Sequence, residues 1–330
     1  MWKEKVFQSS KRMAVPIMTH PGIEIIGKNV YDAVTDGKVH FEAIKALSDR
    51  YPSSVCTVIM DLTVEAEAFG ASVEFYKNDI PTVIGRLLPD MQAVERLEIP
   101  DLGKGRLPQY LLANQLAVEH IKDKPIWGGM IGPFSLAGRL YDMSEFMMAC
   151  YCEPEGAKVL LQKCTDFLIT YCSALKQQGV SGVVLAEPAA GLLSNEGCEE
   201  FSSFYIRQIV KKLQDDNFMI VLHNCGNTGH CTPAMISTGA SGLHFGNSVN
   251  MVDTLKECPK DVLVMGNLDP VSLFKSGTSD DVKKATRDLL ERTSEFSNFI
   301  ISTGCDVPPS VSLQNIEAFY AAIDEFNRLR

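Results

Sequence analysis

One stretch, residues 218–226, constrains both the fold and the chemistry of this chain. It reads Phe-Met-Ile-Val-Leu-His-Asn-Cys-Gly, so an apolar run leads directly to His223, Cys225 and a glycine. An apolar run that ends in a glycine turn predicts a buried strand. Successive side chains of a strand point to opposite faces. His223 and Cys225 are separated by one residue, so they point the same way.

A second stretch near the end of the chain has the same form. Residues 299–309 read Phe-Ile-Ile-Ser-Thr-Gly-Cys-Asp-Val-Pro-Pro, with Cys305 after the apolar run and beside a glycine. His223, Cys225 and Cys305 supply one imidazole and two thiolates, a set that suits zinc and leaves one position for water or substrate. The alternative is that these cysteines simply pack in the core. Both stretches end strands, where α/β proteins place their chemistry, and this favours the metal site.

The composition excludes several classes of protein. With 330 residues, 45% hydrophobic and 22% charged, the chain can bury a large core and is typical of soluble enzymes. The net charge of −10 argues against nucleic acid as a partner. No apolar span approaches the ~18 residues of a membrane helix, and the first residues lack a signal-peptide core. We therefore expect no membrane partner and a cytoplasmic location, where the 10 cysteines stay reduced.

Apolar segments that alternate with helical ones set the expected fold. We predict a (β/α)8 TIM barrel, an α/β fold, formed by residues 1–330 as a single domain. Such barrels have ~250 residues, and an insertion at 64–123, between strands two and three, absorbs most of the excess. It contains a hairpin at 71–76 and 81–86. The expected strands cover 14–20, 55–61, 125–132, 182–187, 218–222, 242–246, 262–267 and 298–303, and the main helices 41–48, 107–121, 143–150, 155–178, 198–214, 279–291 and 312–329.

In such a barrel the active site lies at the carboxyl ends of the strands. Polar residues at those ends, and in the turns that follow, are therefore candidates for binding substrate. For the two acidic candidates, capping a helix or holding an arginine is equally compatible with the sequence. The candidates are Asp61, Ser135, Arg139, Glu187, His244 and Asn267.

The segment 132–135 indicates how an anionic substrate can be held. It reads Gly-Pro-Phe-Ser, which ends a strand and opens a helix with proline in the first turn. Backbone amides at a helix N-terminus, with the positive end of the helix dipole, bind anions. Ser135 can add a hydroxyl group, and Arg139 can add charge from the next turn. The alternative is that the glycine and proline only shape the turn and that Arg139 is solvated.

Several motifs resemble the uroporphyrinogen decarboxylase superfamily. They are Leu-His-Asn-Cys-Gly-Asn at 222–227, Gly-Asn-Leu-Asp-Pro at 266–270, Gly-Pro-Phe-Ser-Leu-Ala at 132–137, Thr-Gly-Cys-Asp-Val-Pro-Pro at 303–309 and Met-Asp-Leu-Thr-Val-Glu-Ala-Glu-Ala-Phe-Gly at 60–70. More closely, they resemble its zinc branch, the methylcobamide:coenzyme M methyltransferases of methanogens. The resemblance covers most of the chain and implies a (β/α)8 fold. It assigns zinc binding to His223, Cys225 and Cys305.

The resemblance also implies an activity. Enzymes of that branch activate a small thiol as a zinc thiolate and methylate it from a methylated corrinoid. The implied cofactors are therefore zinc and a methylcobamide or methylcobalamin donor. A separate corrinoid protein is the expected partner, because no segment here resembles a cobalamin-binding domain. Two alternatives stay open: a lyase similar to uroporphyrinogen decarboxylase, and a non-catalytic corrinoid-handling protein in which the zinc is structural.

Two positions depart from these patterns. Gly246 stands where the methyltransferases carry an acidic residue that can occupy the fourth zinc position, so water or His244 is expected there at rest. The arginine-rich N-terminal motif with which the decarboxylases hold substrate carboxylates is missing. Residues 19–22, Thr-His-Pro-Gly, stand in that region. The second departure favours the methyltransferase branch.

Overall fold

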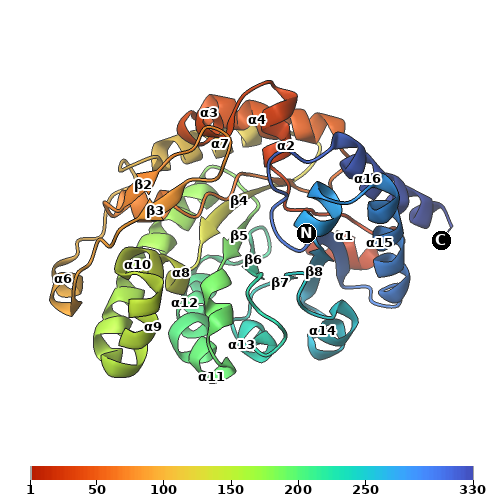
Figure 1. Ribbon diagram of the computed structural model, residues 1–330. Coiled ribbons are helices and arrows are strands. Elements are labelled where there is room, and N and C mark those ends of the chain that lie inside the picture. Colours follow the sequence, from red (N-terminus) through yellow and green to blue (C-terminus); the bar gives the residue numbers. More distant parts are fainter. Residues whose placement is uncertain (1, 330) are drawn as a thin grey trace.

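Seven parallel strands form the central sheet of the structure, a computed structural model that describes residues 2–329. Their order is β1-β4-β5-β6-β7-β8-β9, so successive strands of this sheet lie side by side. The sheet is curled, and helices cover its outer side (Figure 1). This arrangement confirms the predicted α/β, TIM-barrel-like fold. The strands are β1 Cys56–Thr57, β4 Ile126–Ile131, β5 Gly182–Ala186, β6 Met219–Asn224, β7 Gly242–Phe245, β8 Leu263–Leu268 and β9 Phe299–Thr303.

An extended segment takes the place of the first predicted strand. The N–H of Val15 donates to the carbonyl of Ile301 in β9, and the N–H of Ser54, just before β1, donates to the carbonyl of Ala14. The segment therefore joins the two edges of the sheet, although it forms no regular strand. The prediction that this strand runs to residue 20 is wrong, because α2 (His20–Ile25) begins there. Its proline lies in the first turn, where the missing N–H costs nothing.

The long predicted helices are all present. One of them, 198–214, is divided by a π-helical segment, Glu199–Ser203, into α11 and α12. Several short helices were not predicted from the sequence. The helices are α1 Trp2–Gln8, α2, α3 Val30–Thr35, α4 Gly37–Arg50, α5 Val64–Ala68, α6 Met91–Arg96, α7 Leu107–His120, α8 Pro133–Tyr141, α9 Met143–Cys152, α10 Pro154–Gln177, α11 Asn195–Cys198, α12 Phe204–Leu213, α13 Thr232–Ser237, α14 Met251–Glu257, α15 Ser279–Arg292 and α16 Leu313–Arg328. Short helical turns at Pro188–Leu192 and Pro270–Lys275 follow β5 and β8.

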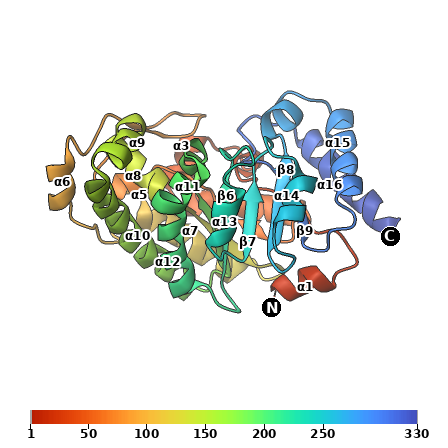
Figure 2. The ribbon, with the colours of Figure 1, turned by 90° about the horizontal axis from the view of Figure 1, so that it is seen from below.

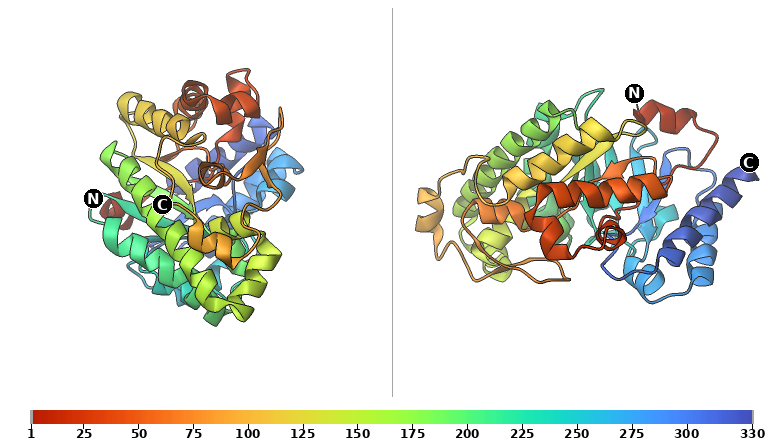
Figure 3. Two further views of the ribbon diagram at one scale, coloured as in Figure 1. Left: turned by 90° about the vertical axis from the view of Figure 1, so that its left-hand side faces the viewer. Right: turned by 90° about the horizontal axis from the view of Figure 1, so that it is seen from above.

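The insertion between the second and third predicted strands is confirmed. It contains α5, the antiparallel hairpin of β2 (Ser72–Glu74) and β3 (Thr82–Ile84), then α6 and α7. Figure 3 shows α6 at one end of the molecule, far from the C-terminal helix α16. None of the helices within residues 2–329 combines the length and the apolar character needed to cross a bilayer.

Apolar side chains fill the amino-terminal half of the barrel interior. Figure 2 shows α1 beyond the amino end of β7, and Trp2 of α1 meets Trp127 edge to face, with ring centroids 5.0 Å apart. Because strand side chains alternate, the next inward positions of β6 and β9, after Val221 and Ile300, are His223 and Ser302. The interior is thus apolar at one end and polar at the other. The buried members of the apolar group are Val6, Val15, Ile17, Val55, Trp127, Val184, Met219, Val221, Leu263, Met265 and Ile300.

Candidate metal centre

Three predicted ligands meet at the carboxyl ends of β6 and β9. The imidazole of His223 and the thiols of Cys225 and Cys305 offer ligand atoms that all lie within 4.8 Å of one another. His223 is only 1% exposed, and its Nε2 atom has no hydrogen-bond partner. An unpaired buried polar atom is costly and calls for an explanation. One nitrogen and two sulfurs form a donor set that fits zinc, so the geometry agrees with the predicted metal site.

The two thiols differ from each other. The neighbouring thiol of Cys305 lowers the pKa of Cys225, whereas the thiol of Cys225, together with burial, raises the pKa of Cys305. Both cysteines are partly exposed, whereas the imidazole is buried. A ligand that enters from the barrel mouth therefore meets the sulfur side of the group first.

Close backbone packing fixes the loop that carries Cys225. A Cβ atom added to Gly226 would lie 2.3 Å from the carbonyl oxygen of Pro188, and one added to Gly246 would lie 2.8 Å from the Cα atom of Cys225. Both approaches are too close for any side chain. The amide of Asn267 donates to the carbonyl of Gly246 at 3.0 Å and to that of Val249 at 2.8 Å, which braces the loop after β7 that packs against Cys225. Asn267 thus supports the backbone next to the candidate ligands.

His244 lies beside His223 on the neighbouring strand. The two residues are paired in the β6–β7 ladder, and their Nδ1 atoms are 2.8 Å apart. The Nε2 atom of His244 lies 2.8 Å from the Oγ atom of Ser302. Burial lowers the pKa of His244 well below its ordinary value. Because both ring nitrogens have partners, the contacts favour support of His223 over direct ligation by His244.

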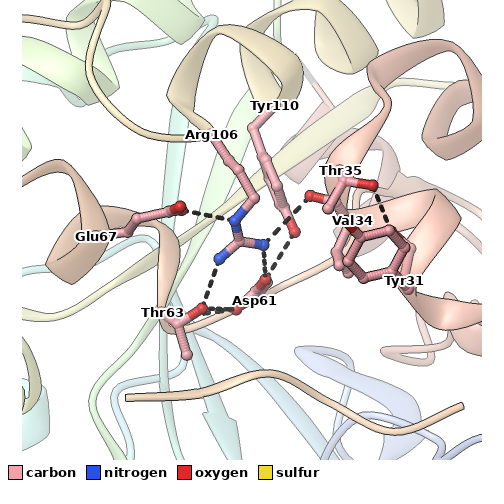
Figure 4. Close-up of polar contacts among 8 residues, drawn as sticks. All are labelled: Tyr31, Val34, Thr35, Asp61, Thr63, Glu67, Arg106 and Tyr110. Atoms are coloured by element: carbon pink, nitrogen blue, oxygen red, sulfur yellow. Dashed lines mark hydrogen bonds and ion pairs between the residues drawn. The ribbon is translucent and has the colours of Figure 1, made fainter. Parts of the chain in front are cut away.

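Asp61 belongs to a second polar cluster, shown in Figure 4. The guanidinium group of Arg106 contacts Asp61 at 2.5 Å, Glu67 at 2.6 Å and the Thr63 hydroxyl at 2.7 Å. The hydroxyl group of Tyr110 donates to Asp61 at 3.1 Å. Asp61 therefore holds an arginine, the alternative role that the sequence left open.

Glu187 occupies the N-terminus of α8. Its carboxylate accepts hydrogen bonds from the N–H of Phe134 at 2.9 Å and of Ser135 at 2.6 Å, and the Ser202 hydroxyl donates to it at 3.3 Å. Burial raises the pKa of Glu187 to about 7. The Ser135 hydroxyl accepts from the N–H of Ala189. The predicted use of these amides for a substrate anion is thus corrected, because a carboxylate of the protein already fills the place.

Arg139 has a different environment. Its side chain, from the same helix, lines a cavity of about 270 Å³ together with Ser135 and Pro188. Within residues 2–329 no carboxylate lies within ion-pair distance of its guanidinium group, and burial lowers its pKa. The carbonyl of Pro188 faces Gly226, the neighbour of Cys225. Pro188 therefore lines the cavity around Arg139 and also contacts the loop that carries the candidate ligand Cys225.

Comparison with known protein families identifies the family of this chain. Residues 10–326 match the model of the family described as Uroporphyrinogen decarboxylase (URO-D). The chain belongs to this family. Residues 2–9, with the helix α1, precede the part that matches the URO-D model.

The curated relatives of this URO-D member include both enzyme types that the sequence resembles. Methylcobamide:CoM methyltransferase MtbA of Methanosarcina acetivorans is 31% identical, over 78% of this chain and 77% of the relative. Methylcobamide:CoM methyltransferase MtaA of Methanosarcina barkeri is 27% identical, over 80% and 78%. Uroporphyrinogen decarboxylase of Legionella pneumophila is 23% identical, over 84% and 80%. A solved methyltransferase from Methanosarcina mazei shares the fold, with a TM-score of 0.89 at 23% identity over 98% and 97% of the two chains.

Two polar features of this URO-D site were not among the predicted substrate-binding residues, although His20 and Asp306 were expected at strand ends. Ser302 lies two residues after Ile300 on the inward face of β9, and strand alternation alone would have found it. His20 and Asp306 form the other feature, with His20 Nδ1 3.1 Å from the carboxylate. Although burial lowers the pKa of His20, Asp306 raises it above its ordinary value. No local pattern reveals this pair, because tertiary folding alone brings the two residues together.

Proposed function

We propose that this URO-D family member is a zinc-dependent methyltransferase that moves a methyl group from a methylated corrinoid to a small thiol. The corrinoid would be carried by a separate corrinoid protein. One observation supports this proposal most directly: the Nε2 atom of buried His223 has no partner and belongs to a ligand group with two partly exposed thiols. The names of the methyltransferase relatives agree with it.

The charges of the ligands determine what the site can do. His223, Cys225 and Cys305 would hold the ion. When bound, zinc supplies the positive charge that keeps a thiol ionised at neutral pH. One neutral imidazole and two thiolates carry two negative charges, which balance a divalent cation. A substrate thiolate that joins them therefore keeps its own negative charge and remains a nucleophile.

The transfer step needs no further redox partner. The substrate thiol loses its proton, and its sulfur forms a bond to the methyl carbon. The corrinoid substrate would supply the methyl group: its cobalt–carbon bond would break with the electron pair left on cobalt, from Co(III) to Co(I), and the thiol proton would pass to solvent. The protein's part is to exclude water from the imidazole side and to hold the sulfur in line with the methyl group.

Arg139 is the best placed of the candidate substrate contacts. Asp61 and Glu187 already accept hydrogen bonds from several donors, and the side-chain amide of Asn267 already donates to backbone carbonyls. Arg139 lines an open cavity and has no ion-pair partner within residues 2–329. We infer that it binds the anionic end of a thiol such as coenzyme M. Arg139→Ala should then raise KM for coenzyme M far more than KM for neutral 2-mercaptoethanol.

The test uses zinc-loaded protein, coenzyme M and methylcobalamin. We expect about one zinc per chain and equal amounts of methyl thioether and cob(I)alamin. A corrinoid protein should be a better donor than free methylcobalamin, because docking supplies positioning. If no thiol is methylated by zinc-loaded protein with any of several donors, the proposal fails. Decarboxylation of uroporphyrinogen under the same conditions would support the lyase alternative instead.

A further inference from the structure

The candidate ligand His223 has an unusual neighbour. A histidine that binds a metal through one ring nitrogen commonly donates the N–H of the other to a carboxylate, a backbone carbonyl or water. Here the position is taken by a second imidazole, that of His244, at 2.8 Å between the two Nδ1 atoms. The rings meet edge to face, with centroids 4.6 Å apart and planes inclined at 74°. His223 and His244 are each only 1% exposed, so bulk water does not compete for this bond.

The position of each proton follows from this geometry. If Nε2 of His223 is to bind an ion, the proton of the neutral ring must be on Nδ1. That N–H points to Nδ1 of His244, which must therefore accept. His244 then carries its proton on Nε2, and this N–H donates to the Oγ atom of Ser302 at 2.8 Å. Ser302 is fully buried in β9, so the chain of contacts is held by three inward-facing strand positions.

We propose that His244 and Ser302 are positioning residues, which hold His223 in the Nδ1–H form and aim its Nε2 atom at Cys225 and Cys305. This inference rests on the proposed function, because it concerns the same metal site. In the opposite arrangement, His244 donates through Nδ1, and the Nε2 atom of His223 carries a proton and cannot bind an ion. An imidazole in this place also adds no charge. The ligand group keeps its two negative charges, whereas a carboxylate neighbour would add a third.

The experiment measures zinc affinity rather than activity. Wild-type protein and variants are titrated with zinc in competition with a chromophoric chelator. We expect His244→Leu, which keeps the volume but has no acceptor, to weaken zinc binding about 10–100-fold. His244→Asn should restore most of the affinity, because the Asn Oδ1 atom can take the place of Nδ1 and accept the same bond. Ser302→Ala should cause a smaller loss, because it only removes the acceptor that selects the His244 tautomer.

A matched control separates positioning from stability. His40 is another fully buried histidine, and its Nε2 atom accepts from the N–H of Ile59 at 3.0 Å, away from the three ligands. His40→Leu should lower the melting temperature of the protein yet leave the zinc affinity unchanged. An equal loss of affinity in His40→Leu and His244→Leu would show a general effect of unfolding and would overturn the inference.

Nitrogen-15 NMR of the zinc-loaded protein gives a direct readout, since the chain has only 6 histidines. The expected spectrum shows His223 protonated on Nδ1 and His244 protonated on Nε2. His244 protonated on Nδ1, or His244→Asn as weak as His244→Leu, would overturn the inference while leaving the proposed function intact. If the wild-type protein binds no zinc at all, the proposed function fails, and the two failures are therefore distinguishable.

Discussion

Two polar clusters lie near the carboxyl ends of the strands, and they differ in how well their atoms are paired. In the first, Asp61 accepts from the guanidinium group of Arg106 and from the hydroxyl group of Tyr110. In the second, the Nε2 atom of His223 has no partner, and two thiols beside it are partly exposed. Native proteins rarely leave buried polar atoms unpaired. The difference indicates that the first cluster serves the architecture and the second serves chemistry.

The first cluster has a clear structural task. Arg106 immediately precedes α7 of the insertion, and it also donates to the carbonyl of Val34. Asp61 and Thr63 follow β1, so the cluster connects the insertion to the barrel (Figure 4). A buried, paired charge of this kind contributes little net stability but is costly to break.

The largest effect is expected from removal of a thiol. Cys225→Ala and Cys305→Ala should each abolish stoichiometric zinc binding, because two protein ligands do not form a stable zinc site. The barrel should stay folded, since the strands do not depend on the ion. Elemental analysis and far-UV circular dichroism measure the two results.

A control for this prediction is Cys258→Ala. Cys258 is buried and lies outside the ligand group, so the variant should keep its zinc. If Cys225→Ala and Cys305→Ala both unfold, the metal is structural, and the contrast between the two clusters disappears.

The next largest effect is expected from the other cluster. Arg106→Ala leaves the carboxylate of Asp61 buried without its cation and should destabilise the protein by about 3–5 kcal/mol. Urea denaturation measures this change. Zinc stoichiometry should be unchanged, because no candidate ligand contacts Arg106.

Arg96→Ala provides the comparison for Arg106→Ala. Arg96 is exposed on α6, and its removal should change stability by no more than about 0.5 kcal/mol. An Arg106→Ala protein that remains stable but loses its zinc would reverse the assignment of the two clusters.

The metal cluster was predictable from the sequence and the arginine cluster was not. His223, Cys225 and Cys305 each follow an apolar run, so the period of the strand and the position of its end located them. Arg106 lies in a polar loop of the insertion, 45 residues from its partner Asp61. No periodic pattern in the sequence predicts an ion pair between residues so far apart in the chain.

Other residues show the same limit. His40 lies in a polar stretch, a pattern that favours the surface, yet it is fully buried, and burial lowers its pKa to about 3. Its place depends on packing against Tyr110, which the local sequence does not specify. Likewise, the N-terminus of α8 was correctly located, but its occupant, Glu187, comes from the end of another strand.

Glu65 is one of several buried residues outside the metal cluster that also have an unpaired polar atom, and it tests the contrast closely. It lies near Asp61, on the architectural side, and is 2% exposed. One of its oxygens accepts from the N–H of Ile131 at 3.0 Å, but the other has no hydrogen-bond partner. Burial raises the pKa of Glu65 to about 7. Its carboxyl group is thus better suited to the protonated form, and the unpaired oxygen requires no ligand to explain it.

The smallest predicted effect follows from this pKa. The folded protein binds the Glu65 proton more tightly than the unfolded chain, in which the pKa is about 4.3. The stability that the protonated group provides is therefore complete below about pH 4.3 and is lost as the pH rises through about 7.

Glu65→Gln should remove this loss, so the variant should gain on the order of 2 kcal/mol relative to wild type between pH 5 and pH 8. Urea denaturation at the two pH values measures the difference, with the exposed Glu98→Gln as a control that should show none. If wild type and Glu65→Gln lose stability equally with pH, Glu65 is already ionised in the folded protein. The contrast between the two clusters would then lose its support, because a charged oxygen on the architectural side would also lack a hydrogen-bond partner.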